Sequence, residues 1–89
     1  MRRVYKYPLP IADAFNLELP AGADLLHVAE QAGTAYMWTM VNPDAAPTVR
    51  QFALRGTGHP IENDDADLSY IGSFVMREQF VFHLFEVLP

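Results

Sequence analysis

The sequence has no cysteine and no apolar stretch approaching the about 18 residues that a membrane-spanning helix needs. Without cysteine the chain can form neither a disulfide nor a thiolate metal cluster, so its core must be held by apolar packing. The basic residues 1–7 are not followed by the apolar segment of a secretion signal. These absences predict a soluble, cytoplasmic protein with no membrane partner.

Positive charge is scarce, because six Lys and Arg residues stand against eleven Asp and Glu residues and the formal net charge is −5. A protein that coats DNA or RNA needs a basic field to neutralise phosphates, so we expect no DNA partner. A small anionic ligand needs only two or three cations. Solvated strand edges are the alternative explanation for the cations. They are Arg2, Arg3, Lys6, Arg50, Arg55 and Arg77.

The chain is short, and its 89 residues predict one domain, residues 1–89. A domain of this size buries only about 60–65% of its unfolded surface. Hydrophobic residues make up 51% of the sequence and aromatic residues 12%, which is more than so small a core can hide. We therefore expect a homo-oligomer, a dimer or a tetramer, that covers part of this apolar surface.

Short segments of strand character, separated by Gly and Pro turns, follow one another along the sequence. Residues 15–19 alternate apolar and polar side chains, residues 3–9 resemble an edge strand, and residues 34–41, 48–55, 68–76 and 79–88 are apolar runs. This pattern predicts an all-β fold, a small antiparallel β-sandwich or barrel. Residues 24–31 fit a helical stripe capped by Asp24 as well as they fit a strand.

Two further structural expectations follow from the composition of these segments. Strands that are apolar on both faces belong in the interior, so we expect Trp38, Phe80, Phe82 and Leu84 to be buried. Residues 62–67 are acidic and contain almost nothing to bury, which predicts a solvated loop.

Catalytic patterns are weak in this sequence. His27, His59 and His83 have no spacing that would place two metal ligands on one element. His83 lies in the most apolar segment, which favours a hydrogen-bonded core histidine, although its nearness to Glu86 leaves a base possible. Ser73 lacks the motif of an activated nucleophile. We expect no catalytic residue, no metal, no cofactor and no enzyme activity.

A glycine-bracketed turn is the most distinctive local feature. Gly56 and Gly58 permit positive φ angles and expose backbone N–H groups, Thr57 adds a hydroxyl, and Pro60 keeps His59 extended. The turn is either an ordinary strand ending or an anion-binding loop.

Aromatic rings and arginines elsewhere in the chain complete the predicted site. Ring faces can stack on a base, and arginines can pair with phosphate, although strand aromatics are commonly core residues. The predicted ligand-binding set is Trp38, Arg50, Arg55, Gly56, Thr57, Gly58, His59 and Tyr70.

Eight short segments, which are named at the end of this paragraph, follow one another along the chain. In sequence and order these segments resemble a widespread family of small phage and prophage proteins known only as a domain of unknown function. The resemblance covers nearly the whole chain and implies that residues 24–31 form a strand. The segments are Tyr5-Lys6-Tyr7-Pro8-Leu9, Leu19-Pro20-x-Gly22-Ala23, Gln31-x-Gly33, Trp38, Val41-Asn42-Pro43-Asp44, Gly56-Thr57-Gly58-His59-Pro60-Ile61, Tyr70-Ile71-Gly72 and Val81-Phe82-His83-Leu84-Phe85-Glu86.

In size, β-content and aromatic supply the chain is also similar to small phage proteins that sequester cyclic nucleotide signals and so blunt host defence of the CBASS type. This analogy implies a non-enzymatic protein of the host cell cytoplasm that binds a cyclic di- or oligonucleotide. The alternative is a phage structural or protein-interaction module that acts on a host or virion protein.

Overall fold

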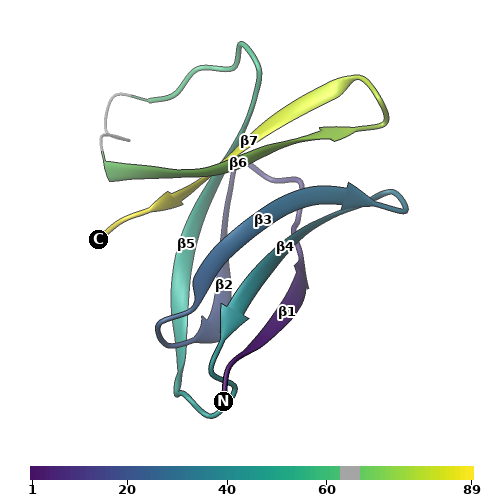
Figure 1. Ribbon diagram of the computed structural model, residues 1–89. Coiled ribbons are helices and arrows are strands. Elements are labelled where there is room, and N and C mark those ends of the chain that lie inside the picture. The colour runs from purple at the N-terminus through teal and green to yellow at the C-terminus, as the bar shows by residue number, and fades with distance from the viewer. Residues whose placement is uncertain (63–66) are drawn as a thin grey trace.

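The computed structural model describes residues 1–62 and 67–89, and these residues form antiparallel β-structure (Figure 1). The predicted all-β fold is therefore confirmed. No helix among them is long and apolar enough to span a membrane. The strands are β1 (Arg3–Pro8), β2 (Ala14–Pro20), β3 (Asp24–Gln31), β4 (Thr34–Val41), β5 (Pro47–Gly56), β6 (Leu68–Met76) and β7 (Phe80–Val87).

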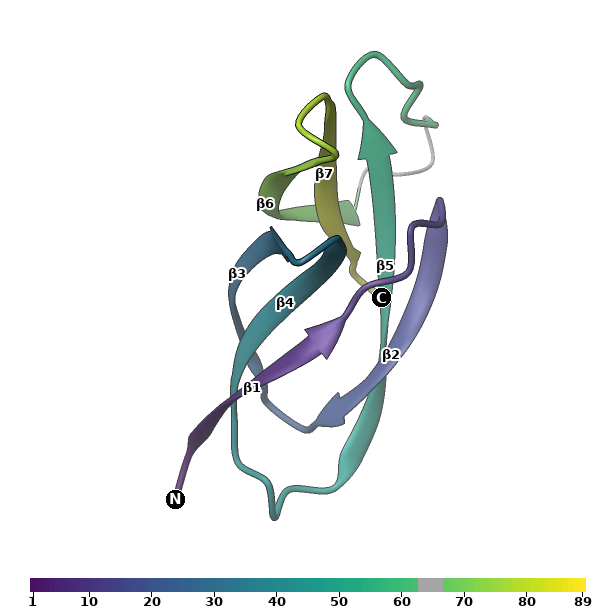
Figure 2. The same ribbon diagram turned by 90° about the vertical axis from the view of Figure 1, so that its right-hand side faces the viewer.

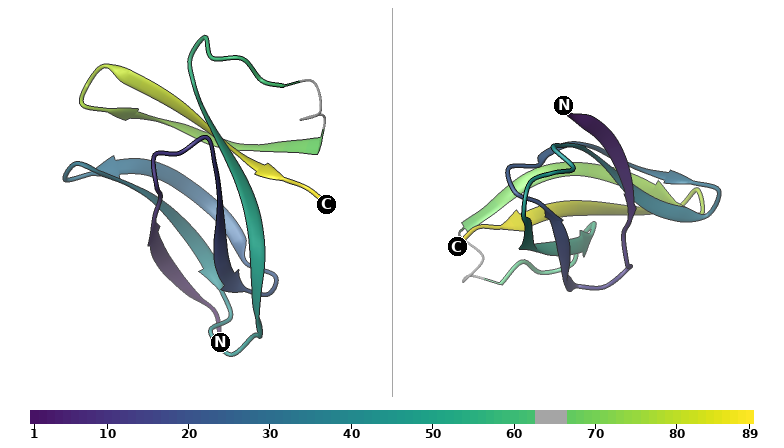
Figure 3. Two further views of the ribbon diagram at one scale, coloured as in Figure 1. Left: turned by 180° about the vertical axis from the view of Figure 1, so that it is seen from behind. Right: turned by 90° about the horizontal axis from the view of Figure 1, so that it is seen from below.

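The strands form two sheets that pack as a sandwich. A three-stranded sheet has the order β1-β4-β3 and a four-stranded sheet the order β2-β5-β7-β6, so β1 is an edge strand as predicted. In Figure 2, β3 and β4 lie on the left and β2 and β5 on the right. The left view of Figure 3 shows that the β3–β4 and β6–β7 hairpins extend to the same side of the molecule.

The sheets approach each other where β3 crosses β6. A Cβ atom placed on Gly72 of β6 would lie 2.8 Å from Cγ2 of Val28 in β3, which is closer than carbon atoms can approach. The glycine therefore allows this crossing. Asp24–Gln31 is a strand, as the resemblance implied, and its pairing with β4 shifts between Leu25 and His27.

The core lies between the sheets, because alternate residues of a strand point to the same face. From β4 the inward residues are buried, and facing them are the buried side chains of the other sheet. Phe15 and Phe52 stack with ring centroids 5.5 Å apart. The main buried side chains are Ala35, Met37, Thr39, Val41, Leu19, Phe52, Leu54, Phe74 and Leu84.

Substantial burial was predicted correctly for Leu84, wrongly for Phe80, and only in part correctly for Phe82 and Trp38. Phe80 is 50% exposed, and Phe82 and Trp38 are partly buried. Phe80 and Phe82 share the inward side of β7 with Leu84, but near the β6–β7 turn this side faces an open hollow. Trp38 lies on the outer face of β4. Most of the acidic segment 62–67 lies outside the described residues.

Candidate binding site

The glycine turn closes the end of β5 with two backbone hydrogen bonds. Thr57 N–H donates to the carbonyl oxygen of Val81 at 3.1 Å, and His59 N–H donates to that of Gly56 at 3.0 Å. The His59 ring folds back over Gly56, where an added Cβ would lie 2.9 Å from the ring. Gly58 has a φ of 86°, and its N–H makes no hydrogen bond to any described residue. Two of the N–H groups proposed for an anion are thus already used.

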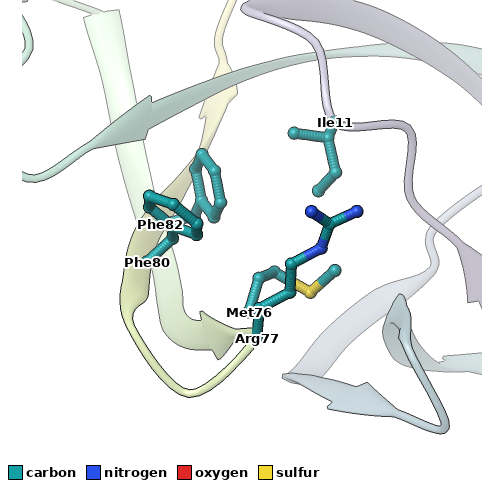
Figure 4. Close-up of a pocket in the computed structure, with 5 residues that line it drawn as sticks. All are labelled: Ile11, Met76, Arg77, Phe80 and Phe82. Atoms are coloured by element: carbon teal, nitrogen blue, oxygen red, sulfur yellow. The ribbon is translucent and has the colours of Figure 1, made fainter.

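Two adjoining hollows separate this turn from the β6–β7 hairpin. One has a volume of about 370 Å³ and is lined by Gly56, Thr57, His59, Gln79, Phe80, Val81 and Phe82. The other has a volume of about 250 Å³ and is lined by Ile11, Met76, Arg77, Phe80 and Phe82 (Figure 4). Because Phe80 and Phe82 line both hollows, we treat them as one feature, the hairpin groove.

Arg77 supplies positive charge to the hairpin groove. Figure 4 shows its guanidinium projecting across the hollow toward Ile11, with the rings of Phe80 and Phe82 on the opposite side. The guanidinium makes no ion pair or hydrogen bond with any residue in the described ranges. An aromatic wall and a cation with no ion pair in the described part of the chain therefore face the same space.

The turn that carries Arg77 has an uncommon backbone. Arg77 and Glu78 have φ angles of 52° and 61°, and Gln79 N–H donates to the carbonyl oxygen of Met76 at 3.1 Å. Asn-Gly is the usual sequence where both central residues of a hairpin turn have positive φ, because side chains larger than these are disfavoured there. The backbone thus holds an arginine where a glycine or asparagine is typical.

Arg55 adjoins the glycine turn but lies outside the hairpin groove. Its Nη1 donates to the carbonyl oxygens of Asp13 at 2.6 Å and Leu54 at 3.0 Å. It borders a separate hollow of about 310 Å³ together with Asp13, His59 and Glu62. The carboxylates of Asp13 and Glu62 would repel an anion bound in this hollow.

Arg50 belongs to a different part of the molecule. Its Nε and Nη2 donate to the Glu86 carboxylate at 2.6 and 2.7 Å, and its Nη1 donates to the Ala23 carbonyl oxygen at 2.6 Å. The hydrogen bond to Glu86 is the main reason that the pKa of Arg50 is raised. Arg50 precedes Gly56 by six residues, about 20 Å along a strand. Its role in this structure is an ion pair that joins β5 to β7.

The two predicted stacking residues lie on the outer faces of different sheets. Trp38 packs beside Tyr36 and His27, with centroids 6.0 and 5.8 Å away. Tyr70 contacts Phe85 edge to face at 5.6 Å. The structure therefore keeps Gly56, Thr57, Gly58 and His59 together with Arg55 beside them, and it separates Trp38, Arg50 and Tyr70 from that turn.

The groove residues that were not in the predicted ligand-binding set are Ile11, Met76, Arg77, Gln79, Phe80, Val81 and Phe82. One signal for them was available: a tight turn at 77–78 without glycine or asparagine between two strongly apolar strands. Phe80 and Phe82 were not considered as ligand-binding residues because they were expected to be buried in the core.

His83 lies on the outer face of β7. Its Nδ1 is hydrogen-bonded to Ser73 Oγ at 2.7 Å and its Nε2 to Thr57 Oγ1 at 2.8 Å. Glu86, which seemed near in sequence, points to the other face and pairs with Arg50. The histidine thus links β5, β6 and β7, and it does not line the hairpin groove.

The described residues contain no group of three His, Cys, Asp or Glu side chains that could hold a metal ion. No curated protein and no solved structure matches the chain. One family model, the domain of unknown function DUF7352, matches residues 1–89, which is the whole sequence. The chain therefore belongs to this family.

Proposed function

We propose that this protein binds a small ligand that combines planar rings with an anionic group, and that it holds this ligand in the hairpin groove without transforming it. The observation that carries the proposal is the Arg77 guanidinium, which lies over a hollow walled by Phe80 and Phe82. A ligand that fills this space gains ring contacts and a charged hydrogen bond together. Nucleotides have this chemistry.

The energies of these contacts suit a nucleotide. Stacking of a base on an aromatic side chain contributes about 1–3 kcal/mol, and an arginine binds phosphate through two parallel hydrogen bonds. The Gly58 N–H lies in the turn that borders the same groove and can add a neutral donor. Two adjoining hollows favour a ligand with two ring units, so a cyclic di- or oligonucleotide is the proposed ligand.

Sequestration is the proposed role, because a chain that holds such a signal intact lowers its free concentration. His59 is the histidine that lines the groove, and it packs on Gly56 with no hydrogen-bonded nucleophile beside it among the described residues. The Ser73 and His83 pair faces the other side of the sheet. We propose that the protein acts as a sponge for a cyclic nucleotide immune signal in the host cell cytoplasm, by analogy with unrelated small phage proteins of similar size and β-content.

Calorimetry with a panel of cyclic di- and trinucleotides tests this proposal. Arg77→Ala should weaken binding by about 1.5–3 kcal/mol, which is about 10–150-fold in Kd, because it removes a charged hydrogen bond. Phe80→Ala should also weaken binding. Arg3→Ala is the matched control, since Arg3 is an exposed arginine of β1 outside the groove.

Three results would count against the proposal. The first is absence of heat with every nucleotide of the panel, which would leave the interaction module as the better function. The second is an Arg77→Ala variant that binds as tightly as the parent while Arg55→Ala loses affinity. This result would indicate that the ligand binds at Arg55, the arginine expected from the sequence. The third is a chemically altered nucleotide recovered after denaturation, since the proposal requires intact ligand.

A further inference from the structure

The outward side chains of β6 and β7 form an uncharged surface, which we call the β6–β7 outer face. Phe74 and Leu84 of these strands point into the core, so their neighbours along each strand face outward. The irregularity of β6 between Tyr70 and Gly72 brings Tyr70 and Leu68 to the same outer face, opposite Phe85 and Val87. Tyr70 is 61% exposed, Val75 47% and Val81 38%. The face consists of Leu68, Tyr70, Ser73, Val75, Val81, His83, Phe85 and Val87, and it contains no Asp, Glu, Lys or Arg.

The polar groups of this face are hydrogen-bonded to one another. Tyr70 OH lies 2.6 Å from Ser73 Oγ, which lies 2.7 Å from His83 Nδ1, while Nε2 of the same ring lies 2.8 Å from Thr57 Oγ1. Burial of a polar group is costly mainly when its hydrogen bonds are lost. This chain of bonds would persist in a dry interface, so the face can be covered with little polar penalty.

We infer that the β6–β7 outer face is the surface through which two copies of this chain associate. Two copies that each carry a net charge of −5 repel each other, so they need to meet at a surface that adds no like charge. A two-fold interface sets a surface against itself, and an uncharged apolar surface is complementary to its own copy. It offers no counter-charge to an acidic or a basic partner.

The size of the face indicates a dimer of modest affinity. Strands of eight and nine residues are about 30 Å long, and these two neighbouring strands with their side chains are about 15 Å wide, so the footprint is about 450 Å². Standard interfaces bury about 800 Å² on each partner, and smaller ones are typical of weaker association. We therefore expect a dissociation constant in the micromolar range.

This interface would leave the hairpin groove open. Val75 points outward and lines neither hollow, whereas Met76, Phe80 and Phe82 line the groove on the inner side of the same hairpin. Val81 borders the groove where the hairpin meets the glycine turn, so the test of dimerisation uses other positions of the face and requires no nucleotide.

Sedimentation equilibrium across a concentration series tests the inference on the full chain. The parent should approach twice the 10.0 kDa chain mass as concentration rises. Val75→Glu or Tyr70→Glu should raise the dissociation constant at least tenfold, because each buries a charge opposite its own copy. Leu26→Glu is the matched control: Leu26 is 48% exposed at the β3 irregularity in the other sheet. Circular dichroism should show the same fold in all variants, since the three positions are exposed.

Each of the following results would overturn the inference. One is a parent chain that remains monomeric at hundreds of micromolar. Another is dimerisation of both Val75→Glu and Tyr70→Glu with the affinity of the parent. A third is an equal loss of assembly in Leu26→Glu, which would show that added charge acts through general repulsion and not through this face.

Discussion

Replacement of Arg50 by alanine would test whether this arginine stabilises the fold, as its contacts indicate, or binds ligand, as the sequence suggested. The Arg50 side chain is 23% exposed and that of Glu86 14% exposed, and two hydrogen bonds of 2.6 and 2.7 Å join them. A third bond reaches the Ala23 carbonyl oxygen. Arg50→Ala would leave Glu86 largely buried without a partner.

The expected loss lies between two known limits. An exposed ion pair contributes about 0–1 kcal/mol, whereas removal of one member of a fully buried pair costs about 3–5 kcal/mol. Partial exposure of both side chains places Arg50→Ala at about 2–3 kcal/mol. For a domain of this size each kcal/mol lowers Tm by about 4–8 °C, so we expect a fall of about 8–24 °C.

Urea unfolding of Arg50→Ala, Glu86→Ala and the double variant measures the effect. The loss of stability in the double variant should be smaller than the sum of the losses in the two single variants, because each single substitution leaves a charged partner unpaired. The pKa of Arg50 is raised in the folded protein, so its contribution is complete below the unfolded-state pKa and is lost only as pH rises through the folded value. Titration of the guanidinium should therefore cause little change in the destabilisation by Arg50→Ala through neutral pH. A loss below 0.5 kcal/mol, or full additivity, would refute the reasoning.

Two further substitutions test the packing between the sheets. Thr39→Val should change stability by less than about 1 kcal/mol in urea unfolding, because the contact of the buried Thr39 Oγ1 with the Tyr7 hydroxyl lacks the geometry of a full hydrogen bond, and its loss is offset by the removal of a buried polar atom; a loss above about 2 kcal/mol would contradict this. Gly72→Ala should destabilise by about 1–3 kcal/mol in the same assay, because its Cβ would contact Val28 at 2.8 Å, and unchanged stability would show that β6 can move away from β3 at little cost.

The sequence was sufficient to predict the strands where one face is buried and the other solvated. In β2 the period-two pattern of Phe15, Leu17 and Leu19 identifies both the strand and its inward face. In β3 the irregularity after Leu25 interrupts the alternation, so a helical stripe fitted equally well until the family resemblance was considered. A one-residue irregularity is set by pairing with β4 and leaves no clear local signal.

The candidate site could be predicted only in part, because its composition depends on which strands become neighbours. Gly56 to His59 are adjacent in sequence and stay together whatever the topology. Trp38 and Tyr70 lie in different sheets, and Arg50 pairs with Glu86, which is 36 residues away. None of these separations follows from local pattern. The burial expected for Phe80 failed for a related reason, since exposure at the end of a hairpin depends on what the opposite sheet covers.

The β6–β7 turn connects backbone strain to the proposed function. Positive φ at Arg77 and Glu78 is unfavourable for both side chains, and such conformations persist when the surrounding structure imposes them. The strands here require a tight turn, since Met76 pairs with Phe80, but the requirement for a turn does not explain an arginine in it. The proposed anion site would explain it, because this turn projects the guanidinium into the hollow that the Phe80 and Phe82 rings line on the opposite side. In a chain with a net charge of −5, Arg50 is engaged by Glu86 and Arg55 lies beside Asp13 and Glu62. Arg77 is thus placed where its charge could act on the proposed ligand, and ligand binding would give the strained turn a function.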